Sequence, residues 1–437
     1  MSIPTLQGLQ TALSGLLAEQ QALDTTGNNI ANANTEGYTR QTVVLGTNTP
    51  INIPATSSLT GQGAQLGTGV SVETITRIRN AYLDAQYRAQ NSALSAATTG
   101  SEELGQAQAA FNEPSSSGLA AQMSAFWSAW SSLANAPTSE AAKEGVVAAG
   151  QQLASTLHEL GAQLSTISTQ AGEQYKSITG PSGEVADYAN QIATLNGQIK
   201  QTEEAGMQAN NMLDRRDLLL DKLSALAQVT VSEQPNHTDT VTFGDAGKPL
   251  VEGTKVNWPQ TLTPAAGGKL GALLSLTSPG GALAGYGTAL DGVAASLAES
   301  VNALHTSTPF FSGTTAATLT VAVTAAQVQT SSKKEAGGND VAQAIAGLRG
   351  GTAEEGYATL VERVGSGVKR ARDEQANMQT TVTAIQNQRQ SVSGVSLDEE
   401  MTNLISFQRG YQASARTLTA MDSMLETLIE HTGTVGL

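Results

Sequence analysis

Residues 1–45 read MSIPTLQGLQTALSGLLAEQQALDTTGNNIANANTEGYTRQTVVL. A heptad line of apolar residues runs through this stretch and predicts a helix that packs one stripe against another helix. The rest of the predicted helix carries mostly amides and hydroxyls, and the first basic residue is Arg40. Amides and hydroxyls cost less to bury than charges, so this side also favours contact with protein. The members of the apolar line are Leu6, Leu9, Leu13, Leu16, Leu23 and Ile30.

The helical pattern ends in an Asn-rich stretch, NNIANANTEGY at residues 28–38. Asn side chains bond nearby backbone and tolerate left-handed geometry, and Gly37 permits a positive φ. A turn is therefore expected here, followed by a strand from Tyr38. Composition alone indicates only a helix end and a loop. The order of residues resembles the N-terminal signature of bacterial flagellar axial proteins, the rod, hook and hook-associated proteins, which is Asn-Asn-Ile-Ala-Asn-x-x-Thr-x-Gly-Tyr.

The C-terminal stretch is the counterpart of the N-terminal one. Apolar residues recur at steps of three and four from Leu397 onward, and the run is similar to the C-terminal helix of the same family. We expect the two terminal helices to pair as a coiled coil that assembles with other copies. The expected assembly interface includes the N-terminal apolar line, the turn residues Asn28, Asn29, Asn32, Gly37 and Tyr38, and the C-terminal residues Leu397, Met401, Leu404, Tyr411, Leu418, Leu425 and Ile429.

Composition excludes several classes of function. The chain has 437 residues, a net charge of −15 and no cysteine. The acidic balance argues against a nucleic-acid partner, and the lack of cysteine rules out disulfides and thiolate ligands. No apolar run is long enough for a membrane span, and the N-terminus shows no secretory signal. Aromatic residues at 4% and charged residues at 14% favour long helices with small side chains in their seams.

No catalytic, metal or cofactor site is expected. The four histidines, His158, His237, His305 and His431, are scattered and form no zinc-binding pair. The sequence Gly180-Pro181-Ser182-Gly183 lacks the spacing of a nucleophile elbow. We therefore expect a protein that is not an enzyme.

The middle of the chain is predicted to be mainly α, with small β insertions in discontinuous domains. Apolar seams over 146–178 and 185–199 are separated by Gly180-Pro181, which favours an antiparallel helical hairpin. Alternating runs predict β structure, including a short hairpin formed by the strands at 38–45 and 70–74. The expected domains are 1–37 with 396–437, a terminal coiled-coil core; 38–228 with 264–308 and 331–395, a long-helix bundle; and 229–263 with 309–330, a β-rich outer insertion.

A dense Asp/Arg cluster lies within NNMLDRRDLLLDKL at residues 210–223. A catalytic or metal site is possible by residue type, but a helix start with local ion pairs is favoured, with Asn211 as the cap and Asp214 as its partner. The stretch resembles the Asn-x-Leu-Leu-Asp-x-Arg-Asp segment of hook-associated proteins at the hook–filament junction, with Met212 at the first Leu position. That likeness narrows the resemblance from flagellar axial proteins in general to the hook-associated proteins.

The resemblance implies a structural subunit of the extracellular flagellum that supports filament growth and motility as a hook–filament adaptor. Implied partners are further copies in a ring or helical array, the hook protein, the second junction protein, flagellin, and an export chaperone at the C-terminal region. Export would use the flagellar type III apparatus without a cleaved signal. A hook or distal-rod protein is the near alternative, and a secreted hydrolase or coiled-coil adhesin on flagellar-type ends is a remote one.

Overall fold

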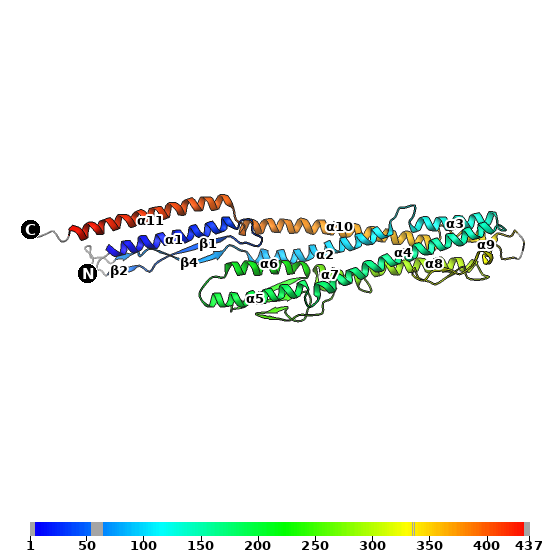
Figure 1. Cartoon of the computed structure of the whole chain (residues 1–437), viewed down its shortest axis with the longest axis horizontal. Coiled ribbons are helices and arrows are strands. Elements are labelled where there is room, and N and C mark those ends of the chain that lie inside the picture. Colours follow the sequence, from blue (N-terminus) through cyan, green and yellow to red (C-terminus); the bar gives the residue numbers. More distant parts are fainter. Residues whose placement is uncertain (1–4, 54–63, 334, 336, 432–437) are drawn as a thin grey trace, which may run out of the picture.

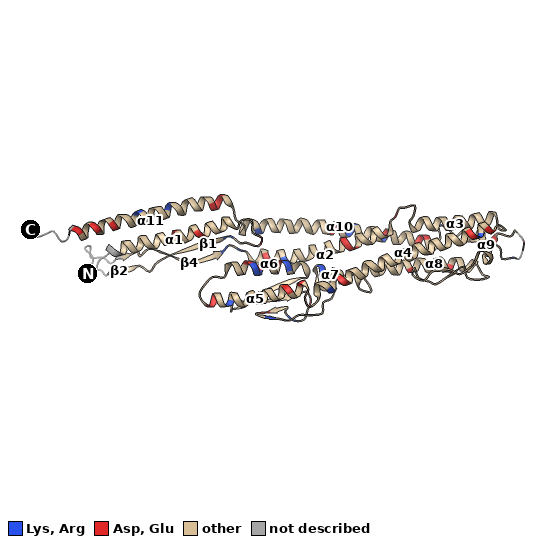
Figure 2. Ribbon diagram, viewed as in Figure 1, with Lys and Arg blue, Asp and Glu red and all other residues tan. Residues whose placement is uncertain are grey.

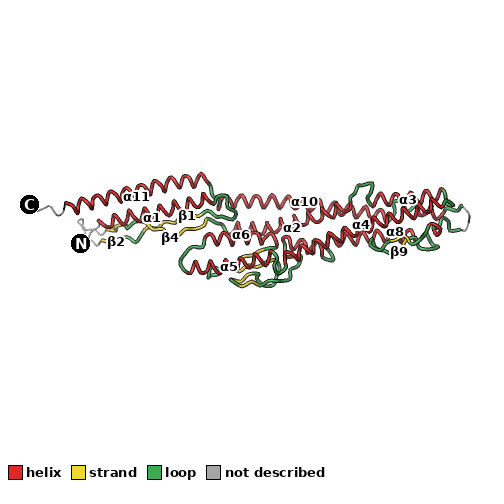
Figure 3. The backbone as a smooth tube through the Cα atoms, viewed as in Figure 1, coloured by secondary structure: helices red, strands yellow, loops and turns green. Residues whose placement is uncertain are grey.

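The computed structural model describes residues 5–53, 64–333, 335 and 337–431. The molecule is a long rod whose helices run along its axis, and the described ends of the chain lie together at one end of the rod (Figure 1). Helices dominate and strands form only small patches (Figure 3). The mainly helical fold expected from the sequence is confirmed.

Eleven α-helices lie within the described residues. They are α1 (Thr5–Ala31), α2 (Ala81–Phe111), α3 (Leu119–Asn135), α4 (Glu140–Thr179), α5 (Glu184–Glu204), α6 (Asn210–Leu226), α7 (Gly268–Thr277), α8 (Ala282–Leu304), α9 (Asp340–Ala346), α10 (Thr352–Ser393) and α11 (Leu397–His431).

The strands within the described residues are short and antiparallel. They are β1 (Gln41–Thr47), β2 (Ile51–Ile53), β3 (Ala64–Leu66), β4 (Val70–Arg77), β5 (Val229–Glu233), β6 (Asp239–Phe243), β7 (Val251–Glu252), β8 (Lys255–Val256), β9 (Phe311–Ser312) and β10 (Thr320–Val321).

The bundle is built on α2 and α10, which pack along each other. Phe111 stacks on Tyr357 and Asp84 binds Arg389, so the two helices are antiparallel. The larger apolar core lies in the half of the rod far from the chain ends, where α3, α4, α8 and α10 enclose an aromatic group (Figure 1). Phe126 lies 5.5 Å from Phe311, measured between ring centroids. Burial of aromatic and leucine side chains supplies the main stabilisation of this region.

A second apolar core joins α5 and α6 to the four-stranded sheet β5-β6-β7-β8. Its centre includes Val241 and Phe243, whereas Phe310 and Phe311 of the later β segment belong to the larger core. The segments 229–263 and 309–330 therefore pack in different places, which corrects their grouping into one outer insertion. Alternation of apolar residues identified strands but carried no information on which core each strand joins.

The helical hairpin also differs from the expectation. The helix α5 packs chiefly on α6 and much less on α4, and it continues past the end of α4 alongside α6 (Figure 1). Gly183 at the α4–α5 turn closely approaches the Ile178 carbonyl, which lies 2.2 Å from where a Cβ would be. Two apolar seams joined by a short turn are compatible with a helical hairpin or with two helices nearly in line. Because α5 packs on α6 and the β5–β8 sheet, it does not fold back along α4.

The terminal unit consists of α1, α11 and the strands β1 to β4. The strands β1 and β4 pair as expected, with Gln41 opposite Arg77 and Thr47 opposite Val70. Between these two strands in the sequence, β2 and β3 pair with each other and continue the same ribbon. This ribbon lies along α1, so α1 is covered by α11 on one side and by strands on another (Figure 1).

Candidate assembly surface at the terminal helices

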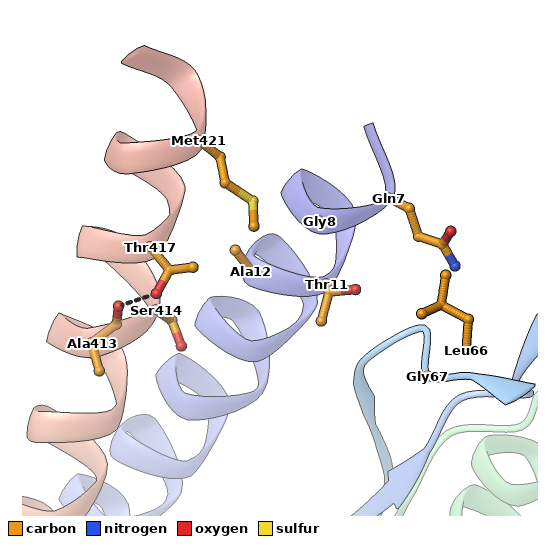
Figure 4. A pocket seen from close by; sticks show the side chains of 10 residues that line it. All are labelled: Gln7, Gly8, Thr11, Ala12, Leu66, Gly67, Ala413, Ser414, Thr417 and Met421. Atoms are coloured by element: carbon orange, nitrogen blue, oxygen red, sulfur yellow. Dashed lines mark hydrogen bonds between the residues drawn. The ribbon is translucent and has the colours of Figure 1, made fainter. Parts of the chain in front are cut away.

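The helices α1 and α11 run antiparallel in a constant register. A Cβ added to Gly8 would lie 2.6 Å from Cε of Met421, and one added to Gly15 would lie 3.1 Å from Oγ of Ser414. Seven residues along each helix thus bring the next pair together, as in a coiled coil. Figure 4 shows Met421 pointing toward Gly8 and Ala12 across the gap between the helices.

The seam on α1 is made of small residues, which corrects the expected leucine seam. Ala12, Ala22, Thr26 and Asn29 are buried, and with Gly8 and Gly15 they follow one another at steps of three, four and seven. Small side chains let two helices approach closely. The predicted line Leu9, Leu16, Leu23 and Ile30 is only half-buried at the edge of this seam, Leu13 is 43% exposed, and the side chain of Leu6 lies outside the described part.

On α11, four of the seven predicted residues face the seam. Leu404, Tyr411, Leu418 and Leu425 are half-buried, and the alternate seam positions are taken by Phe407, Ser414 and Met421. Leu397, Met401 and Ile429 are exposed. The apolar side chains that do not pack between α1 and α11 therefore remain accessible to other chains.

The Asn-rich turn is a hydrogen-bonded junction between the two ends of the chain. Asn29 is 1% exposed and uses its whole amide. Its Nδ2 donates to the Gln41 carbonyl at 2.8 Å and to Glu400 Oε2 at 3.1 Å. Its Oδ1 accepts from the Gln41 backbone N–H at 3.0 Å and from the Tyr38 hydroxyl at 2.8 Å. Asn29 thus fixes the end of α1, the start of β1 and the start of α11 together.

The other turn residues support this junction. Asn32 donates to the Asn28 side chain at 2.9 Å, and Asn28 accepts from Tyr38 at 3.2 Å. Gly37 has a φ of +80° and lies against Leu218 of α6, so a side chain there would be strained. Burial, together with the negative charges of Asp214 and Glu400, raises the pKa of Tyr38 to about 12, so its hydroxyl remains a donor.

Glu400 and Arg40 complete the junction and were not singled out from the sequence. Arg40 Nε donates to Glu400 at 2.7 Å, and its Nη1 donates to Glu399 at 2.6 Å. Glu400 is 1% exposed, and the contact with Asn29 satisfies its other oxygen. Glu400 is one of three acidic residues in the first turn of α11, where acidic residues look like ordinary dipole partners, so only its burial reveals this role.

The Asp/Arg cluster on α6 forms ion pairs with residues far away in the sequence. Asp217 binds Arg77 at 2.9 Å, Arg88 at 3.0 Å and Arg79 at 3.2 Å. The predicted preference for ion pairs over a catalytic or metal site agrees with this arrangement, but the pairs are long-range. Further pairs in the network are Arg77–Asp214, Arg79–Asp84, Arg88–Asp221, Arg389–Asp84 and Arg389–Asp221.

The expected cap of α6 is wrong. The helix begins at Asn210, and the Asn211 side chain accepts from Gln41 Nε2 at 3.2 Å. Asp214 accepts from the Thr39 backbone N–H at 3.1 Å in addition to Arg77. Both side chains thus serve the contact between α6 and the terminal unit, because the ribbon brings donors to them.

Among the open grooves of the terminal unit, two lie beside α1. One lies between α1, α11 and β3, where the Gln7 side chain lies over Leu66 (Figure 4). The other lies between α1, β4 and the turn at Met207. Within the described residues, no group of His, Asp or Glu is arranged to hold a metal ion, and no helix is long and apolar enough to cross a membrane.

Family models match three parts of the chain. The model described as the flagellar hook-associated protein FlgK helical domain matches residues 104–266. The flagella basal body rod protein model matches residues 9–39, and the C-terminal model of the flagellar basal body rod FlgEFG proteins matches residues 385–430. The two terminal matches coincide with α1 with its turn and with the end of α10 plus α11.

Relatives of known name agree with these matches. Flagellar hook-associated protein 1 of Bacillus subtilis is 29% identical over 510 residues, which covers 99% of both chains. The protein of the same name from Escherichia coli is 32% identical over 56% of this chain, but the match spans only 43% of that protein's length. The structure of the flagellar hook junction protein FlgK from Burkholderia pseudomallei is similar at 26% identity and a TM-score of 0.45, with 52% of this chain and 46% of that one covered.

Proposed function

Because this chain belongs to the family of flagellar hook-associated protein 1, structural proteins of the hook–filament junction, we propose that it assembles through its terminal unit. Copies would pack side by side through the apolar residues that the α1–α11 pair leaves accessible, and so form a ring or helical array. Repeated heterologous contacts produce closed rings or filaments. The interface residues expected from the sequence are thus proposed here as contacts between copies, with Asn29 acting inside the chain.

One observation carries this proposal. The exposed large apolar side chains among the described residues gather on the terminal unit and its borders. Exposed apolar patches of this kind mark interaction surfaces more often than single scattered residues do. They include Leu13, Leu17, Leu45, Ile51, Leu66, Leu397, Met401 and Ile405.

We expect Leu13→Glu to abolish assembly while leaving the isolated chain folded. Leu13 is 43% exposed, so a charge there changes little in the monomer but is desolvated in a contact between copies. The measurement is the amount of labelled protein at the distal end of isolated hook–basal bodies, together with motility. Ala162→Glu is the matched control, because Ala162 is an exposed apolar residue on α4, in the bundle and away from the terminal unit. Normal assembly of Leu13→Glu would contradict the proposal.

The proposed partners depend on a place at the hook–filament junction. We propose that the assembled chain contacts the hook protein on one side and the second junction protein, and through it flagellin, on the other. An export chaperone would hold the C-terminal region before assembly, and export through the type III apparatus would need no cleaved signal. Labelling at the distal hook end supports the junction, whereas labelling within the rod would favour the hook or distal-rod alternative.

We further propose that the chain acts without catalysis and that its domains follow the core structure: the terminal unit, the bundle, and the sheet region on α5 and α6. The sheet region is small, and none of its described residues belongs to a group of side chains that could hold a metal ion. Activity on peptidoglycan or casein would favour a hydrolase instead. Loss of surface binding with motility intact, on deletion of residues 232–260, would favour an adhesin.

A further inference from the structure

We propose that the groove between α1 and β4 receives the outer face of α11 from a second copy, with Asp24 and Glu73 facing Arg409 and Arg416. This inference rests on the proposed self-assembly and specifies which surfaces meet. It predicts a heterologous contact, because the groove and the face that fills it belong to different sides of the terminal unit.

The groove has an apolar floor and an acidic border. Its volume is about 730 Å³, and Ala18 and Val72 lie along it. Leu17 and Met207 stand at its edges with exposed fractions of 55% and 60%. Leu17 is two residues from both Gly15 and Glu19, which contact α11, so it lies on the opposite side of α1. The groove is therefore directed away from the α11 of its own chain.

One carboxylate lines this groove, and a second lies beyond it on the same face of α1. Glu73 lines it, and Asp24 follows Leu17 by seven residues, which places it on the same face of α1. Both are exposed, and the structure shows no ion pair for either within its described part. The border of the groove can therefore bind a cationic side chain of another copy.

The outer face of α11 has the complementary character. Ile405, Arg409 and Arg416 are exposed and recur at steps of four and seven. Arg416 lies two residues from both Ser414 and Leu418, which are on the inner side, so it points away from α1. Figure 2 shows the basic residues in the middle of α11 and acidic residues toward both of its ends. Over the stretch described, neither arginine has an ion pair.

These two faces cannot meet within one molecule, but every copy offers both. Placing copies side by side in the same orientation brings the basic face of one against the acidic groove of the next. Opposite charges then fix the register, and Ile405 meets the apolar floor. Such charge complementarity favours this contact over arrangements that bring like charges together. Because the contact is heterologous, its repetition from copy to copy produces either a closed ring or a helical array.

Charge reversal tests the contact in flagellated cells. The acidic-side variant combines Asp24→Arg with Glu73→Arg, and the basic-side variant combines Arg409→Asp with Arg416→Asp. For each variant, we measure the ratio of labelled protein retained at the hook end to labelled protein shed into the medium. Each variant alone is expected to be retained at least about tenfold less than the original chain. Expressed together, they should restore retention, because each groove then meets a face of opposite charge in an alternating array.

Matched charge reversals on the bundle are the controls. Glu362→Arg and Arg372→Asp are exposed on α10, away from the terminal unit, and should leave retention unchanged. Retention of either single-side variant at the original level would overturn the inference, and so would failure of co-expression to restore it. Failure of the original chain to reach the hook end would instead refute the proposed function. Melting followed by circular dichroism shows that each variant is folded.

Discussion

Replacing Asp217 by Ala is expected to lower the free energy of unfolding by about 3–5 kcal/mol, the range for a buried ion pair that loses one partner. Asp217 lies within 3.2 Å of Arg77, Arg79 and Arg88, so its removal leaves three guanidinium groups close together with less compensating charge. Urea unfolding followed by circular dichroism measures the change. Asp187→Ala is the control, since Asp187 is exposed on α5 and should change stability by less than about 0.5 kcal/mol.

The same residue predicts an acid limb in the stability profile. Burial favours the neutral acid, but the charges of Arg79, Arg88 and Arg77 outweigh it and lower the pKa of Asp217 to about 2, from an ordinary value of 3.8. A carboxylate with a depressed folded pKa stabilises the fold above its unfolded pKa. This contribution, about 2 kcal/mol, is lost as the pH falls from about 4 through about 2. Asp217→Ala should flatten this limb, and an unchanged limb would contradict the assignment.

The second large effect is expected at Asn29. Asn29→Ala removes hydrogen bonds to both backbone groups of Gln41, to Tyr38 and to Glu400. Leaving buried polar partners unsatisfied should cost about 2–4 kcal/mol. We expect hydrogen exchange of α1, β1 and the start of α11 to accelerate together, because Asn29 joins all three.

Two further variants sharpen that experiment. Asn28→Ala should cost less than about 1 kcal/mol, since Asn28 is exposed and water can replace its partners. Asn29→Asp should be at least as harmful as Asn29→Ala, because it places a second carboxylate beside Glu400. If Asn28 and Asn29 variants behave alike, the junction is not the element that joins the chain ends.

Much of the fold was accessible from periodicity. The terminal helices, their pairing, the β1–β4 ribbon and the long helices of the bundle follow from apolar spacing and turn residues, which are local properties. The family was accessible from the order of residues in 28–38 and 210–217. The choice of seam on α1 was not accessible, because leucines usually mark the buried stripe whereas here Gly8, Ala12 and Gly15 occupy it.

The amino-acid sequence by itself determined most of the helices and the β1–β4 pair, that apolar residues recur along both terminal helices, and which family the chain resembles. Only the tertiary structure decided which stripe is buried, which core each β segment joins, and that Glu400 and Arg40 close the Asn-rich turn. The physical reason is that spacing along the chain sets local geometry, whereas burial and charge pairing depend on residues hundreds of positions apart.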